Sequence, residues 1–199
     1  EGDTHKGVVY LDPTDLTKYC DASNSVSTTG TKEGCMKWYI YSEDETNYNM
    51  ILDHNTTATV TSWDESKNQI LTDTVSWKSS LNARLITAEE VAEITGNTNF
   101  DSLNATNSDW FYFDSNTTEQ TATSQGKSKY AWLYNYTIEC TSYGCNEEDS
   151  STWGYWTNTA FKTNNAWFVH RAGDLNINIV SVPRNGVRPV ITISKSILN

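Results

Sequence analysis

The chain has 199 residues, of which 37% are hydrophobic and 12% aromatic, and it carries a formal net charge of −11 at pH 7 with a pI near 4.6. This negative charge opposes binding to nucleic acid or to an anionic membrane surface, and no stretch approaches the roughly 20 apolar residues of a transmembrane helix. The length predicts one domain over residues 1–199. Trp and Tyr must fill much of its core, because aliphatic residues are few.

The first part of the chain predicts short strands and one helix. A β-rich run covers Gly7–Leu11. Two further runs, Cys35–Tyr41 and Tyr48–Asp53, flank a polar turn and therefore predict a hairpin. Apolar residues recur at helical spacing over Asp64–Trp77, which predicts a modest amphipathic helix.

The clearest local signal is a second helix that begins after Thr87. Thr87 and Glu90 have the spacing of a capping box, in which each side chain bonds the other residue's backbone amide. Ile86 before the cap and Val91 after it have the spacing of a hydrophobic staple. Gly96 then predicts the end of the helix, where a left-handed residue is favoured.

The rest of the chain predicts a long loop followed by a meander of strands. Residues Asn97–Lys129 are polar and predict a loop with one embedded strand, and the aromatic run Tyr130–Tyr136 predicts another strand. Four more predicted strands follow in chain order: Trp153–Thr157, Ala166–His170, Ile177–Ser181 and Val187–Ser194.

Four cysteines form two pairs that are close in sequence, Cys20 with Cys35 and Cys140 with Cys145. Four cysteines allow three pairings, and the local pairing is the one we expect. Free thiols and a metal site are the alternatives, but the spacing of zinc ligands is missing. Disulfides predict an oxidising location, either secreted or at the cell surface.

Three segments carry a resemblance to a known family. Ala83–Val91 resembles the start of the helix in the formylglycine-generating-enzyme-like, or sulfatase-modifying-factor-like, branch of the C-type lectin fold. Gly186–Val190 resembles the strand that ends such domains. Trp156–Thr159 with Ala166–Val169 is similar to the strands before that ending in bacterial surface proteins. The resemblance covers roughly Leu81–Ser194 and is weaker over residues 1–80.

The resemblance implies an α+β, C-type-lectin-like fold. Such a fold has mixed or antiparallel sheets, one or two short helices and long loops. Its N- and C-terminal strands pair, which would place Gly7–Leu11 beside Val187–Ser194. As an analogy of fold, this supports the scaffold more than the chemistry.

The chain departs from the chemistry of that family. No cysteine follows Cys145, so the redox cysteine pair of the oxidase members has no counterpart. The Glu-Pro-Asn and Trp-Asn-Asp motifs of calcium-dependent sugar-binding lectins are also missing. We therefore expect no cofactor. Calcium at the acidic run Glu147–Asp149 is an alternative that no motif indicates.

The loops between the late strands build the ligand face in C-type-lectin-like proteins. Aromatic rings there would supply contact area and amides would supply specificity. Trp156 and Trp167 are also candidates for the core, and Arg188 is expected to make a structural salt bridge or carbonyl contact. The predicted ligand-binding residues are Trp153, Tyr155, Trp156, Asn158, Asn164, Trp167, His170, Arg171, Asp174, Asn176 and Asn178.

These observations predict a non-catalytic extracellular recognition protein, of the adhesin or receptor-binding type and bacterial in origin. It would bind a protein or glycan on another cell or surface through the late-strand loops, which are hypervariable in related retroelement-diversified proteins. No G-x-S-x-G motif or phosphate-binding glycine loop is present. A glycan-acting hydrolase and a structural subunit of a surface appendage are the alternatives. The oligomeric state is left open.

Overall fold

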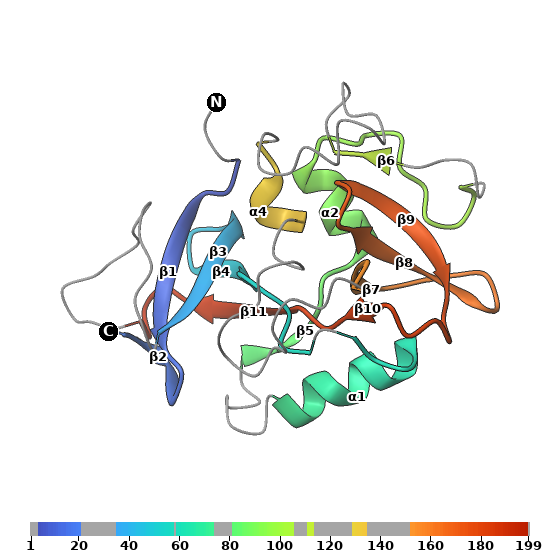
Figure 1. Cartoon of the computed structure of the whole chain (residues 1–199). Helices are drawn as coiled ribbons and strands as arrows, with labels where there is room; N and C mark the ends of the chain where they lie inside the picture. Colours follow the sequence, from blue (N-terminus) through green and yellow to red (C-terminus); the bar gives the residue numbers. More distant parts are fainter. Residues whose placement is uncertain are drawn as a thin grey trace.

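The computed structural model describes residues 4–20, 35–57, 59–73, 81–105, 111–113, 129–134 and 152–198. Within these ranges the protein is mostly β, with short helices and curled sheets that are largely antiparallel, consistent with the expected α+β class (Figure 1). Two sheets carry the architecture, one of six strands and one of five.

The first sheet has the strand order β2-β1-β3-β4-β11-β5. One face of this sheet packs into a core of its own. The other face is also covered in part, because Val8 and Tyr10 of β1 and Ile51 of β4 belong to other hydrophobic clusters. Its strands are β1 (Gly7–Asp12), β2 (Asp15–Tyr19), β3 (Met36–Glu43), β4 (Asn47–Leu52), β5 (Arg84–Leu85) and β11 (Pro189–Ser194).

The second sheet has the strand order β10-β7-β8-β9-β6. All of its pairs are antiparallel except that of β10 with β7, which is parallel. The predicted late meander is confirmed for its first three strands, β7, β8 and β9, although β9 begins three residues earlier than expected; the fourth predicted strand forms β11 in the first sheet. The strands are β6 (Phe111–Tyr112), β7 (Gly154–Phe161), β8 (Asn165–His170), β9 (Asp174–Ile179) and β10 (Asn185–Gly186).

The predicted hairpin is formed by β3 and β4, with Trp38 opposite Leu52. Asp44 organises its turn, because one oxygen of its carboxylate accepts hydrogen bonds at 2.7 Å from the backbone amides of both Thr46 and Asn47. These bonds lower the pKa of the Asp44 carboxyl to about 2, since they favour its charged form.

The expected pairing of the first and last strands is wrong. β1 pairs with β2 and β3, whereas β11 pairs with β4 and β5. The β3–β4 hairpin lies between the two strands, since Ile51 of β4 pairs with Tyr39 of β3 on one side and with Val190 of β11 on the other. The chain ends thus contribute to the same sheet without touching as neighbours.

Helix α2 (Ala88–Ile94) begins as the sequence predicts. The Thr87 hydroxyl accepts a hydrogen bond from the Glu90 amide at 3.1 Å, and the Glu90 carboxylate accepts one from the Thr87 amide at 2.8 Å. Ile86 and Val91 are both fully buried. Gly96 has a φ of 72°, the left-handed conformation that ends the helix.

Two other helices frame the sheets. Helix α1 (Trp63–Asp73) confirms the helix expected in that region, and it lies along β5 below the second sheet (Figure 1). Helix α4 (Ala131–Tyr134) replaces the strand predicted for that aromatic run. Trp132, Leu133 and Tyr134 are all buried. The carbonyls of Trp132 and Leu133 in this helix both accept hydrogen bonds from the Arg188 guanidinium, which holds the segment in its helical form.

Arg188 ties α4 to the first sheet. Its side chain is fully buried and donates hydrogen bonds to three backbone carbonyls, those of Leu52 at 2.5 Å, Leu133 at 2.8 Å and Trp132 at 2.9 Å. Because the guanidinium presents its donors as a planar fork, it can bond β4 and α4 at the same time. The expected structural carbonyl contact of Arg188 is confirmed.

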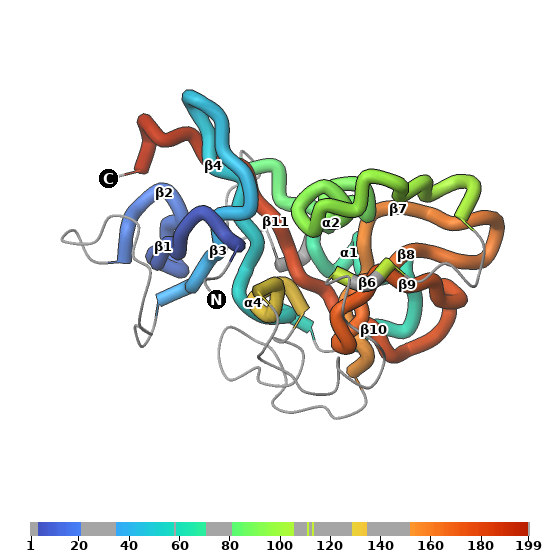
Figure 2. Tube along the Cα trace, turned by 90° about the horizontal axis from the view of Figure 1, so that it is seen from above, coloured from blue at the N-terminus to red at the C-terminus, as the bar shows by residue number. Residues whose placement is uncertain are grey.

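The largest hydrophobic cluster contains residues from both sheets as well as α2 and α4. Figure 2 shows β11 running from the first sheet toward the second, with α4 beside it. A second cluster lies on the opposite face of the second sheet, where Ile70 of α1 meets Trp156 and Phe168. The second sheet is therefore buried on both faces, and this packing holds the segments at its two ends in place.

The cysteine prediction is confirmed for one pair. Cys20 and Cys35 form a disulfide with a Cα–Cα distance of 5.8 Å. Cys140 and Cys145 lie outside the described residues, as does the acidic run Glu147–Asp149.

Candidate functional site

The predicted ligand-binding residues all lie on β7, β8, β9 or the segments next to them, but they differ in burial. Tyr155, Trp156 and Trp167 are fully buried, and Asp174 is 1% exposed. These four side chains belong to the interior and do not face a partner. The remaining seven are half-buried or exposed: Trp153, Asn158, Asn164, His170, Arg171, Asn176 and Asn178.

The buried rings have clear core roles. Trp167 packs against Phe100 and Phe161 with centroid distances of 4.9 and 5.5 Å, and its indole N–H donates to the carbonyl of Ser102 at 3.2 Å. The Tyr155 hydroxyl donates to the carbonyl of Leu133 at 3.1 Å, and burial raises the pKa of that hydroxyl. Tyr155 and Trp156 are consecutive on β7 and turn to opposite faces, and both are buried because both faces of the second sheet are covered.

The structure divides the accessible residues between two ends of the sheet. Asn158 and Asn164 lie toward the β7–β8 turn, whereas His170 and Arg171 lie where β8 leads into β9. The six residues of β8 extend over about 20 Å at roughly 3.3 Å per residue. One small ligand cannot contact both ends, so we treat them as separate surfaces.

The end at the β8–β9 connection gathers positive charge around an aromatic ring. The backbone N–H of Trp153 donates a hydrogen bond to the carbonyl of Arg184 at 2.7 Å, and the carbonyl of Trp153 accepts one from the backbone N–H of Arg171 at 2.7 Å. The Arg184 guanidinium lies 4.4 Å from the centroid of the Trp153 ring. Arg171 also donates from its side chain to the carbonyl of Thr152 at 3.1 Å. We call Trp153, His170, Arg171 and Arg184 the cationic corner.

His170 is held in place by a buried carboxylate. Its Nδ1 lies 2.9 Å from an oxygen of Asp174, and the other oxygen of Asp174 accepts a hydrogen bond from the Asn176 amide at 3.2 Å. The side chain of Asp174 is 1% exposed and that of His170 is 25% exposed. Asp174 is thus a positioning residue that fixes the imidazole ring, whose opposite edge is oriented outward.

The backbone under this corner leaves no room for adjustment at Gly154. A Cβ built on Gly154 would lie 1.8 Å from the carbonyl oxygen of Val169 on the neighbouring strand. Only glycine permits this approach of β7 to β8 next to Trp153. The corner is therefore anchored to tightly packed strands at Gly154 and His170, and its other residues lie in the segments next to these strands.

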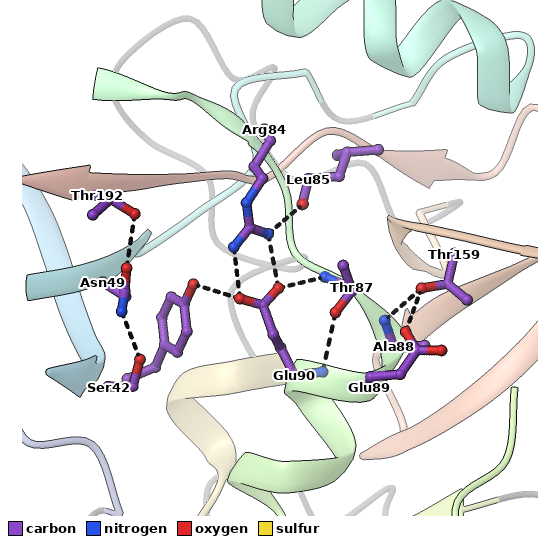
Figure 3. Close-up of polar contacts among 11 residues, drawn as sticks. Ser42, Asn49, Arg84, Leu85, Thr87, Ala88, Glu89, Glu90, Thr159 and Thr192 are labelled. Carbon is purple, nitrogen blue, oxygen red and sulfur yellow. Dashed lines mark hydrogen bonds and ion pairs between the residues drawn. The ribbon is translucent and has the colours of Figure 1, made fainter. Parts of the chain in front are cut away.

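A second polar cluster joins α2 to both sheets (Figure 3). Arg84 forms a two-pronged ion pair with the Glu90 carboxylate at 2.6 and 2.7 Å, and the Tyr41 hydroxyl donates to Glu90 at 3.1 Å. The hydroxyl of Thr159 on β7 accepts a hydrogen bond from the Ala88 amide at 2.9 Å. This cluster fixes the helix start between β5 and β7.

The charges of this cluster perturb each other's pKa. Burial alone would raise the pKa of the Glu90 carboxyl, but the hydrogen bonds from Arg84 and from the Thr87 amide hold it below its usual value. Burial, together with the nearby Glu90 carboxylate, raises the pKa of the Tyr41 hydroxyl. Glu90 is therefore kept ionised as the acceptor of the cluster, which is a structural role.

Sequence analysis missed Arg184 as a member of the corner. The only available signal was its place before Asn185-Gly186, a turn-like pair ahead of the final strand. Within the described residues, no three His, Cys, Asp or Glu side chains are grouped to hold a metal ion. In the same ranges, no helix has the length and apolar character needed to cross a membrane.

Comparisons of the chain with protein-family models, curated proteins and solved structures find no match. The segments that carry the lectin-like resemblance form β5 and the start of α2, parts of β7 and β8, and the approach to β11.

Proposed function

We propose that this protein is a non-catalytic extracellular recognition module that binds a protein or glycan through the cationic corner. A C-type-lectin-like scaffold is part of the same proposal and rests on the sequence segments described above. The Cys20–Cys35 disulfide supports an oxidising location such as the cell surface or the extracellular space.

The observation that carries the proposal is the construction of the corner. His170 ends β8, and Trp153, Arg171 and Arg184 lie in segments next to the strands of the second sheet, where neighbours hold them before any ligand arrives. Trp153 is stacked against Arg184, and His170 is oriented by Asp174. Groups fixed in advance lose less conformational entropy on binding, which favours affinity.

The chemistry of the corner favours a ligand with acidic groups. The Arg184 guanidinium lies over the Trp153 ring, and His170 and Arg171 lie in the segment that pairs with residues 153–154, in a chain whose net charge is −11. A guanidinium can bond a carboxylate with two parallel hydrogen bonds, and a tryptophan ring offers a flat apolar face. Acidic glycans and acidic protein segments both present this combination.

Binding to immobilised acidic and neutral glycans and to a panel of purified surface proteins tests this function. The double variant with Trp153→Ala and Arg184→Ser should lower the affinity for any bound partner at least tenfold. Asn164→Ala, at the opposite end of the sheet, is the matched control and should leave binding unchanged. Circular dichroism of each variant confirms that the fold is retained.

Two results would overturn the proposal. Equal binding by the corner variant and the wild type would move recognition elsewhere on the surface. Turnover of a bound glycan that is abolished by His170→Ala would replace recognition with hydrolysis.

A further inference from the structure

A cavity of about 230 Å³ lies between α1, β5 and β7, away from the cationic corner. Its lining combines apolar and polar side chains: Lys67, Ile70, Ala83, Arg84, Leu85 and Asn158. The volume is smaller than the roughly 300–1,000 Å³ of pockets that take drug-sized ligands. It therefore suits a single ring or a short hydrocarbon chain.

The floor of the cavity is apolar and fixed. Ile70 is 4% exposed and Leu85 is 2% exposed, and both belong to the hydrophobic cluster that contains Trp156. Such a floor can bury the hydrocarbon part of a ligand, which is favourable because apolar surface is removed from water.

The rim of the cavity carries three polar residues. Arg84 is held by its two bonds to Glu90, and Figure 3 shows it extending between Leu85 and Glu90. Asn158 is exposed, and its backbone N–H donates to the carbonyl of Ile86 at 2.8 Å. The Lys67 ammonium lies 3.6 Å from the centroid of the Trp63 ring.

The charge of the lining is positive. Lys67 and Arg84 are both cations, and none of the six lining residues is acidic. Glu90 offsets part of the Arg84 charge from behind, but the Lys67 ammonium has an aromatic ring as its described neighbour. An anionic group at this rim would gain attraction from a partly desolvated cation, which is stronger than attraction in open water.

We propose that this cavity binds a small carboxylic acid with an apolar body. The carboxylate would lie at the rim, where the Lys67 ammonium attracts it and the side-chain amide of Asn158 can donate to it. The hydrocarbon body would rest on Ile70 and Leu85. This site is independent of the recognition function proposed above, because it shares no residue with the cationic corner.

An NMR titration of the ¹⁵N-labelled protein with benzoate tests the proposal, with benzamide as the neutral probe of the same shape. Benzoate should cause saturable shifts at the amides of Arg84, Leu85 and Asn158. Benzamide should bind at least fivefold more weakly. Lys67→Gln should weaken benzoate binding about fivefold and leave benzamide binding unchanged.

A second variant guards against indirect effects. Ala83→Phe places a ring in the cavity and should abolish the shifts caused by benzoate, while the remaining spectrum stays that of a folded protein. Lys195→Gln is the control for removal of a positive charge far from the cavity, and it should bind benzoate as the wild type does. Equal affinity for the two probes, unchanged binding by the Lys67 variant, or no saturable shift would each overturn the proposal.

Discussion

Replacing Arg188 with Met removes the guanidinium that joins α4 to β4 and keeps a side chain of similar length. The three carbonyls of Leu52, Trp132 and Leu133 each lose a charged hydrogen-bond donor. Leu133 keeps the hydroxyl of Tyr155 as a donor. The main damage is therefore expected at Leu52 and Trp132.

The size of the effect follows from two opposing contributions. Hydrogen bonds to charged groups stabilise by about 1.5–3 kcal/mol each, so that three contribute roughly 4.5–9 kcal/mol. Burying the guanidinium costs several kcal/mol, and Arg188→Met removes that cost. We expect the free energy of unfolding to fall by about 3 kcal/mol, which is a large part of the roughly 5–15 kcal/mol of a typical domain.

Urea denaturation followed by tryptophan fluorescence measures this change. Arg188→Lys should not rescue stability, because a single ammonium group cannot reach carbonyls on both β4 and α4. Arg184 is exposed, and Arg184→Met is the control. It should lower the free energy of unfolding by less than about 1 kcal/mol, the contribution of the contact between Arg184 and the Trp153 ring. An Arg188→Met protein within about 0.5 kcal/mol of the wild type would refute the carbonyl argument, since such small changes are typical of surface substitutions.

Three further predictions concern the helix start, the strand contact and the disulfide. The lowered pKa of Glu90 stabilises the fold at pH values above 4.5, the ordinary pKa of a glutamate, and this contribution is lost as pH falls through the folded-state pKa. Glu90→Gln should therefore lower stability at pH 7, and its urea midpoint should change less than that of the wild type between pH 7 and pH 3. Gly154→Ala should prevent stable folding, because its Cβ would collide with the carbonyl of Val169. Gly96 has open space around it but a φ of 72°, so Gly96→Ala should lower the free energy of unfolding by only about 1–2 kcal/mol in the same denaturation assay. Reduction of the Cys20–Cys35 disulfide, which closes a loop of 15 residues, should lower the free energy of unfolding by about 3 kcal/mol. Calorimetry with and without reductant measures this change, and an unchanged midpoint of thermal unfolding would contradict it.

Local features of the fold were predictable because their chemistry lies within a few residues. The capping box of Thr87 and Glu90 and the left-handed Gly96 need only neighbours along the chain. The β3–β4 hairpin was predicted by two apolar runs around a polar turn. The first disulfide followed from the proximity of its cysteines.

Features that depend on distant contacts were beyond sequence reasoning. Tyr130–Tyr136 has the aromatic composition of a strand, yet α4 forms where Arg188 bonds two of its carbonyls. The burial of both Trp156 and Trp167 could not be assigned from the sequence, because it depends on α1 covering one face of the second sheet and α2 packing on the other. Lys67 was not a candidate, because its place beside Arg84 depends on how α1 packs.

The position of β11 also affects how the chain folds during translation. β4 emerges from the ribosome before β11, the strand that completes its hydrogen bonding, and all the elements from α1 to β10 are made between them. The nascent β1–β4 segment must therefore wait with an open edge, a state prone to pairing with other chains. A chaperone that shields this edge should raise the yield of soluble protein more than one that acts on the completed chain.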